Sequence, residues 1–324
     1  MRSNQKVLIL GGAGFFGQNF VRWLLKNGRK EITVVDSLDP LFQSKKEDFG
    51  AIYDDIRFIQ GDIRDEKLLA SVVPNTDIIF NLAGQTSHPN SLKDPISDAG
   101  VNVIGILKVL LAVKDLNPNA IVAFSSSSTL VGKALSEVID ENHAERPLDI
   151  YSAHKGIAEK YHRIFSNSYG LKTRVIRFAN LYGPYGKADS AFGFANHFIN
   201  KAINGEKLTV FGDGAQIRNM LFVEDACEAL WAATDSQLPE GEPFFAAHEE
   251  HLSVKEIAWT IAEIFGTCAQ TIPWPEDRKK IEISHQKISS EKFRALTGWR
   301  PKYSLAEGLL LTKKAMNANL KSLD

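Results

Sequence analysis

Two residues that can move a proton together, Tyr151 and Lys155, lie four positions apart in the sequence. On a helix this spacing places the phenol and the ammonium group on the same face. A free phenol has a pKa of about 10 and is a poor base at neutral pH, but a neighbouring cation favours the phenolate. The pair therefore predicts a general base for an alcohol, with the pKa of Tyr151 lowered by Lys155.

A run of hydroxyl side chains, Ser125 to Thr129, follows directly on a predicted strand at 120–125. The carboxyl ends of parallel strands form the edge at which open α/β sheets bind their ligands. One of these hydroxyls is therefore expected to share a proton with an oxygen of the substrate.

A glycine-rich turn, Gly11-Gly12-Ala13-Gly14-Phe15-Phe16-Gly17, separates a predicted strand from a predicted helix. Glycines at 12 and 14 permit a tight turn and let the backbone approach a pyrophosphate, which the helix N-terminus stabilises, while Gly17 allows close packing of helix on strand. Asp36 ends the next strand, where a carboxylate binds the two ribose hydroxyls and repels a 2′-phosphate. The motif predicts a dinucleotide site that prefers NAD to NADP.

The elements expected to position these groups alternate along the first half of the chain. Strands are predicted at 6–10, 32–35, 56–60, 78–82, 120–125 and 173–178, with helices at 16–27, 101–115 and 151–169. This alternation indicates a Rossmann-type, doubly wound parallel α/β sheet followed by a smaller C-terminal α/β domain. We predict a cofactor domain at 1–180 that carries the catalytic residues and a substrate domain at 181–324, with exchange of a strand or helix between them.

Composition excludes several kinds of partner. A net charge of −1 over 324 residues provides no field to attract nucleic acid or an anionic membrane. Lys108 and Lys114 interrupt the longest apolar run, so no membrane span is expected. The 2 cysteines fit a reducing cytoplasm, and His248-Glu249-Glu250-His251 lacks the spacing of a zinc helix, so no metal site is predicted.

Together, these motifs resemble the extended short-chain dehydrogenase/reductases, and more narrowly the NAD-dependent nucleotide-sugar epimerase/dehydratase group typified by UDP-galactose 4-epimerase. Besides the glycine turn, the serine run and the Tyr/Lys pair, the resemblance is carried by Asp62-Ile63, Leu82-Ala83-Gly84, Arg177-x-x-Asn180-x-Tyr182-Gly183-Pro184, Arg218-x-x-x-Phe222-Val223-x-Asp225 and Leu296-Thr297-Gly298-Trp299-Arg300-Pro301.

The resemblance implies three sets of site residues. The catalytic residues would be Ser127, Tyr151 and Lys155. The NAD-binding residues would be Gly11, Gly12, Gly14, Phe15, Phe16, Gly17, Asp36, Asp62, Ile63, Leu82, Ala83, Gly84, Asn102, Ser125, Tyr151 and Lys155. The residues for a nucleotide-diphosphate sugar would be Ser127, Asn180, Val210, Phe211, Arg218 and Arg278, although a solvated basic run is an equal interpretation of Arg278. A homodimer joined by the helices at 101–115 and 151–169 is implied as well.

The implied reaction is transient oxidation of the sugar at C4, followed by return of hydride to the other face of the 4-keto sugar. The related 4,6-dehydratases usually carry Thr-Asp-Glu where this chain has Ser127-Ser128-Thr129, and the decarboxylases tend to have a glutamate in place of Ser128. Epimerisation of a UDP-sugar at C4 is therefore favoured over dehydration or decarboxylation. A non-catalytic NAD-binding regulatory protein is the alternative class. A lone histidine, His88, is interpreted as structural, with substrate contact as the alternative.

Overall fold

The computed structural model describes residues 5–42, 44–234, 237–275 and 286–320. Its centre is a seven-stranded sheet in the order β3-β2-β1-β4-β5-β6-β10, with every neighbouring pair parallel. The strands are β1 (Val7–Leu10), β2 (Ile32–Asp36), β3 (Arg57–Gln60), β4 (Ile78–Asn81), β5 (Ile121–Ser127), β6 (Lys172–Phe178) and β10 (Pro243–Ala246). This is the doubly wound order of a Rossmann fold, as the sequence predicts.

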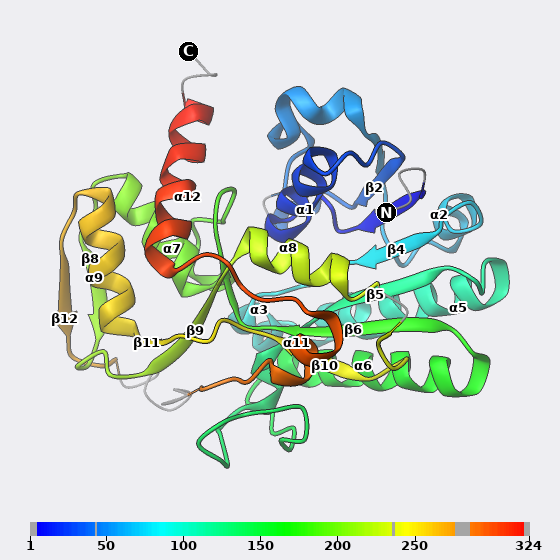
Figure 1. Ribbon diagram of the computed structural model, residues 1–324. Coiled ribbons are helices and arrows are strands. Elements are labelled where there is room, and N and C mark those ends of the chain that lie inside the picture. The colour runs from blue at the N-terminus through cyan, green and yellow to red at the C-terminus, as the bar shows by residue number, and fades with distance from the viewer. Residues whose placement is uncertain (1–4, 43, 235–236, 276–285, 321–324) are drawn as a thin grey trace.

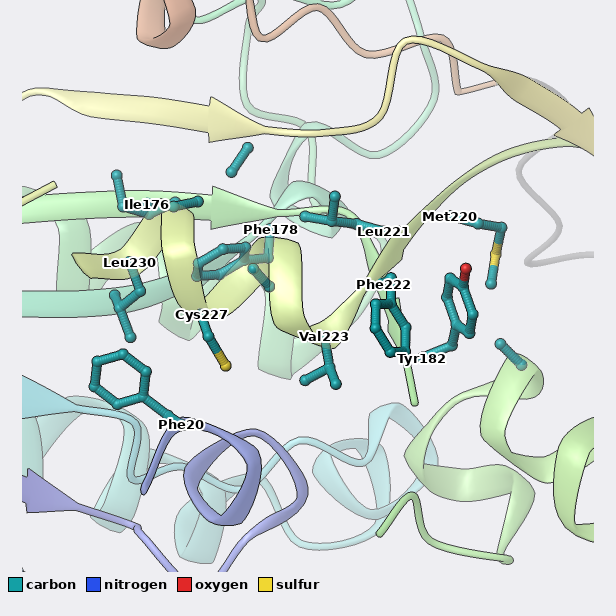
Figure 2. Packing of buried hydrophobic residues seen from close by; sticks show 14 of the residues in the cluster. Phe20, Ile176, Phe178, Tyr182, Met220, Leu221, Phe222, Val223, Cys227 and Leu230 are labelled. Carbon is teal, nitrogen blue, oxygen red and sulfur yellow. The ribbon is translucent and has the colours of Figure 1, made fainter. Parts of the chain in front are cut away.

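Helices cover both faces of this sheet (Figure 1). One face carries α1 (Phe15–Lys26) and α8 (Val223–Ala232), and the other carries α2 (Glu66–Val72), α5 (Ile106–Leu116) and α6 (Ile150–Tyr169). Phe20 of α1 lies close to Cys227 and Leu230 of α8 in the core between these two helices (Figure 2). Each helix presents a buried apolar stripe to the near-continuous apolar strands beneath it, which stabilises this layered arrangement.

The predicted strands and helices are present with small shifts at their ends. Strand β5 continues to Ser127, so most of the serine run belongs to the strand itself. The predicted helix at 101–115 begins with a π-helical stretch, Gly100–Gly105, before α5. Two short helices, α3 (His88–Lys93) and α4 (Pro95–Ala99), precede it. Asp149 begins α6 by accepting the backbone N–H of Ser152, and Gly170 ends it in the left-handed conformation.

Residues beyond 180 form two smaller sheets and also return to the large one. One small sheet contains β11 (His251–Ser253), β9 (Ile217–Phe222) and β7 (Asn180–Tyr182), and the other pairs β12 (Ala269–Ile272) with β8 (Leu208–Phe211). The remaining helices are α7 (Phe194–Ile203), α9 (Val254–Phe265), α11 (Glu291–Thr297) and α12 (Leu305–Leu320). Strand β10 pairs with β6 at the edge of the large sheet, so the chain crosses between the two parts more than once. The division at 180 remains a prediction.

One helical stretch, Pro95–Leu116, is by length and composition able to cross a membrane, so the expectation that no run is long enough is wrong on that criterion. Lys108 and Lys114 leave this helical stretch apolar enough to meet the criterion. In the fold, however, Ile106, Val109 and Leu110 of this stretch are fully buried against the large sheet. It is therefore a helix of the protein core.

Candidate functional site

A cleft opens along the carboxyl edge of the large sheet and gathers most of the predicted cofactor and catalytic residues. The predicted residues that line it are Gly11, Gly14, Phe15, Phe16, Gly17, Asp36, Asp62, Ile63, Leu82, Ala83, Gly84, Ser125, Ser127, Tyr151, Lys155 and Asn180. They come from the carboxyl ends of β1 to β5 and the turns that follow them, from the start of α1, from α6 and, for Asn180, from β7, because the carboxyl ends of parallel strands meet at one edge.

Close backbone approach explains the glycine turn at one end of this cleft. Gly11 has a φ of 79°, and a Cβ there would lie 2.5 Å from the backbone nitrogen of Ala83. A Cβ on Gly17 would lie 2.5 Å from the carbonyl oxygen of Gly11. Gly12 is buried beneath the turn, where a Cβ would lie 2.6 Å from Val34, and it does not line the cleft. The turn therefore packs backbone against backbone and leaves the N-terminus of α1 beside the cleft.

Asp36 links the turn to the second strand. One carboxylate oxygen accepts the N–H of Ala13 at 2.9 Å, and the other accepts the N–H of Leu38 at 2.9 Å. Burial raises the pKa of Asp36, while these two hydrogen bonds and the charge of Lys187 lower it in part. Asp62 also lines the cleft, and a bidentate pair with Arg64 keeps the pKa of its carboxyl below the usual value.

The three predicted catalytic side chains meet on one side of the cleft. Tyr151 is 7% exposed and its phenol is hydrogen-bonded to the side chain of Ser127. The hydroxyl of Ser127 also lies 2.9 Å from that of Thr129, which accepts the hydroxyl of Ser152 at 2.9 Å. The ammonium group of Lys155 donates to the carbonyl oxygen of Ser125 at 2.9 Å and lies 5.9 Å from the centre of the Tyr151 ring.

Among the protein's own groups, Lys155 does not lower the pKa of the Tyr151 phenol, so that expectation is wrong. Burial raises the pKa of Tyr151 far above its usual value, the hydrogen bond with Ser127 lowers it, and the charges of Asp149 and Asp98 raise it again. Burial also lowers the pKa of Lys155 to about 8, although Asp98 and Glu159 oppose that shift. Removal from water is the largest cause of both shifts, because each charged form loses its hydration.

Asn102, predicted to line the cofactor channel, lies behind the cleft wall instead. Its amide nitrogen donates to the carbonyl oxygen of Gln85 at 2.8 Å and to Asp98 at 3.0 Å. Its buried Oδ1 has no hydrogen-bond partner in the described part of the chain, and a Cβ on Gly84 would lie 2.8 Å from it. Asn102 therefore supports the backbone at Gly84, from within the π-helical stretch, rather than forming the channel surface.

The predicted substrate residues separate into two groups. Asn180 lines the cleft and donates to the carbonyl oxygen of Asn219 at 3.0 Å. Val210, Phe211 and Arg218 do not line it: Val210 is 1% exposed, the Phe211 ring packs on Trp274, and Arg218 lies on β9. Burial argues against contact of the Val210 side chain with a nucleotide base. Arg278 lies outside the described residues.

Sequence reasoning missed several residues of the cleft wall. Lys187 lies 4.6 Å from the centre of the Phe192 ring and 5.9 Å from that of Phe42, and burial lowers its pKa to about 8 against the opposing charge of Asp36. Its only sequence signal is its position just after the glycine and proline cluster at 181–186. His88 also lines the cleft, which favours substrate contact over the structural interpretation of this histidine.

A nicotinamide dinucleotide fits the residues present. The glycine turn lines the cleft through Gly11, Gly14 and Gly17 and leaves the N-terminus of α1 beside it, and Asp36 lies in the same cleft, at the end of β2. This sheet order, glycine turn, acidic strand end and Tyr/Lys pair define a dinucleotide-binding α/β enzyme of the short-chain dehydrogenase/reductase type.

The chain belongs to the NAD dependent epimerase/dehydratase family, which matches residues 7–246, and its cofactor is NAD. The low-salt glycan biosynthesis protein Agl12 of Haloferax volcanii is 32% identical, over 94% of this chain and 96% of its own length. The dTDP-glucose 4,6-dehydratase of Mycolicibacterium smegmatis is 28% identical, over 92% of this chain and 89% of its own length.

Solved structures of related epimerases have the same fold as this chain. The structure of the UDP-glucose 4-epimerase from Thermotoga maritima with UDP-glucose superimposes with a TM-score of 0.87 at 29% identity, covering 97% of this chain and 99% of that one. The family is one of enzymes, and the relatives of this chain include epimerases, dehydratases and decarboxylases that act on nucleotide sugars. Membership thus establishes the family and its cofactor but not the reaction.

Proposed function

We propose that this protein is an NAD-dependent UDP-sugar 4-epimerase that works by transient oxidation at C4. The observation that carries the proposal is the meeting of Ser127, Tyr151 and Lys155 in the cleft that also holds the glycine turn. Ser128 and Thr129 occupy the positions where the related dehydratases and decarboxylases carry acids. Tyr151 and Ser127 are therefore equipped for proton transfer at one oxygen, as epimerisation requires.

When bound, NAD supplies the hydride acceptor for C4 and returns the hydride afterwards. Tyr151 takes the proton of the C4 hydroxyl, and Ser127 holds the same oxygen by a hydrogen bond. Burial keeps the Tyr151 phenol protonated in the free protein, so its base form requires the positive charge of Lys155 and that of the nicotinamide when NAD is bound. Lys155, fixed by the carbonyl oxygen of Ser125, holds a positive charge beside the ring.

The test is product formation from UDP-galactose and UDP-N-acetylglucosamine, followed by NMR. We expect the C4 epimer from at least one of them, with Tyr151→Phe slower by about 10²- to 10⁴-fold because it lacks the proton-transferring oxygen. Tyr151→Phe should still bind NAD. Tyr161→Phe is the matched control, because Tyr161 lies on the same helix but packs in the core outside the cleft. A variant Tyr151→Phe that turns over normally would refute the assignment.

We also propose a cytoplasmic homodimer joined through α5 and α6. Ile104, just before α5, is 47% exposed, and Leu111 of α5, Ile157 and Ile164 of α6 are 38%, 37% and 51% exposed. Such apolar side chains on adjoining helices are typical of a surface that pairs with its copy. Both cysteines are free thiols, which fits a reducing compartment.

Substituting Ile164→Asp should convert the dimer to a monomer, because a carboxylate would be buried at the interface. Light scattering after gel filtration measures the mass. Leu310→Asp on α12 is the control, since Leu310 is 56% exposed on a different part of the molecule. A wild-type monomer, or a dimer that Leu310→Asp disrupts and Ile164→Asp does not, would rule out this interface.

A further inference from the structure

His88 lies in the cleft directly against the proposed base. It is the first residue of α3 and lines the cleft with Tyr151. The centres of the two rings are 4.9 Å apart, and the rings meet edge to face at 79°. The side chain of His88 is 41% exposed. This position differs from that of a histidine that only fills the core.

Asp149 holds the imidazole in one orientation. The Nδ1 of His88 lies 2.6 Å from one carboxylate oxygen of Asp149, and the other oxygen accepts the backbone N–H of Ser152 at 2.8 Å. Although burial acts to raise the pKa of Asp149, the hydrogen bond and charge of His88 lower it. An ionised Asp149 favours the proton on Nδ1, so Nε2 is the nitrogen left to accept a proton.

His88 is also distinguished by what surrounds it. The other titratable residues lining the cleft, apart from Tyr151 and Lys155, are Asp36, Asp39, Asp62, Arg64 and Lys187, which come from the end of β2, from the turns after β2 and β3 and from the loop after Gly186. They belong to the part of the cleft around Asp36. Among the described residues, His88 is therefore the one imidazole that faces the Ser127 and Tyr151 side of the cleft.

A second pair in the molecule provides an internal comparison. His154 of α6 contacts Asp98 through Nδ1, also at 2.6 Å. Its side chain is only 15% exposed, and it does not line the cleft. The two pairs share their geometry but differ in access to a ligand.

We propose that His88, oriented by Asp149, is a second acid–base group that moves a proton on and off a carbon next to the C4 ketone of the sugar. The inference rests on the proposed oxidation at C4, because only a ketone makes the neighbouring C–H acidic. It adds proton exchange at C3 or C5 to the oxidation at C4.

The step balances within the cleft. Nε2 of His88 takes the proton, the C–H electron pair forms a double bond to the carbonyl carbon, and the carbonyl pair moves onto oxygen. Tyr151 and Ser127 hold that enolate oxygen by hydrogen bonds. The imidazolium then returns a proton to the same carbon. Because the His88 side chain is partly exposed, its proton exchanges with water between the two steps.

The experiment supplies the ketone ready-made and watches for deuterium. UDP-4-keto-6-deoxyglucose is incubated with the NAD-loaded protein in D2O, and NMR follows the C3 and C5 protons against a protein-free blank. We expect exchange at one of them at least tenfold faster than in the blank. His88→Asn, whose amide can keep the bond to Asp149 but lacks Nε2, should fall to the blank, as should His88→Gln. His154→Asn should exchange like the wild type.

Wild-type exchange no faster than the blank would overturn the inference, and so would full exchange in folded, NAD-binding His88→Asn. The epimerase assay with UDP-galactose and UDP-N-acetylglucosamine reports separately on the proposed function. Exchange of the supplied ketone without C4 epimerisation would refute the 4-epimerase and leave the role of His88 supported. Epimerisation without exchange would support the 4-epimerase and overturn the role of His88.

Discussion

The two walls of the cleft are built in different ways. One wall comes from the turns after β1 to β5 and from α6, where each side chain is placed by the strand or helix that carries it. The other comes from residues from 178 onward, including Asn180, Lys187 and the segment 192–196. That wall depends on contacts between segments far apart in sequence: Arg22 of α1, for example, stacks its guanidinium 4.0 Å from the Tyr185 ring.

The difference decides what a sequence can reveal. The position of Tyr151 and Lys155 follows from helical spacing, and that of Asp36 follows from the end of a parallel strand. Val210 and Arg218 were placed in the substrate site only by resemblance, and neither lines the cleft. The first wall should accordingly be sensitive to small backbone changes, and the second to changes of charge.

The largest effect should come from Gly17→Ala in the glycine turn. A Cβ there would lie 2.5 Å from both the Gly11 carbonyl oxygen and the Gly12 Cα, so the turn must shift. We expect a loss of about 1–3 kcal/mol in the free energy of unfolding together with loss of NAD binding. Thermal unfolding and calorimetric titration with NAD measure the two effects.

Gly14→Ala in the same turn is the matched comparison. The nearest atom to a Cβ at Gly14 is the Gly11 carbonyl oxygen at 3.4 Å, an ordinary contact. This variant should therefore lose less stability than Gly17→Ala. Equal losses would show that close backbone packing is not what this wall depends on.

A smaller effect is expected from Asp36→Asn, which removes a charge and leaves one of the two backbone N–H donors, that of Ala13 or that of Leu38, without its acceptor. The carboxylate favours ribose hydroxyls and repels a 2′-phosphate. We expect the ratio of NADP to NAD affinity to rise by about 10- to 100-fold, which corresponds to about 1.4–2.8 kcal/mol. Asp39→Asn is the control, because Asp39 also lines the cleft but follows the strand end rather than forming it. If Asp39→Asn changes the ratio as much, Asp36 is not the selective group.

Sequence predicted the large sheet well because its signals are local. Apolar runs of strand length, a glycine turn and helix-spaced side chains each depend on a few neighbouring residues. The pKa of Tyr151 was predicted in the wrong direction because burial, which depends on the whole fold, outweighs the nearby lysine. The sequence leaves His88 between a structural role and substrate contact, because its partner Asp149 is 61 positions away. Contacts of that kind cannot be read from spacing.

The smallest expected effect tests the second wall through pH. Lys155 and Lys187, one from each wall, both have a pKa lowered by burial to about 8. Below that pH both are cationic in the free protein, and above it both lose the charge. NAD is anionic, so its affinity should fall as pH rises through about 8, by up to about tenfold for each lysine that contacts it.

The variant Lys187→Gln separates the contributions of Lys187 and Lys155 to the pH dependence of NAD binding. Without the charge from the second wall, NAD should bind more weakly at neutral pH, and the affinity should change less between pH values below and above 8, with Lys155 alone titrating. Lys133→Gln, at an exposed position outside the cleft, should leave the profile unchanged. Titration calorimetry at both pH values measures this. If Lys187→Gln binds NAD like the wild type at both pH values, the second wall contributes shape but no charge to cofactor binding. Lys187 then faces Asp36 instead of a phosphate.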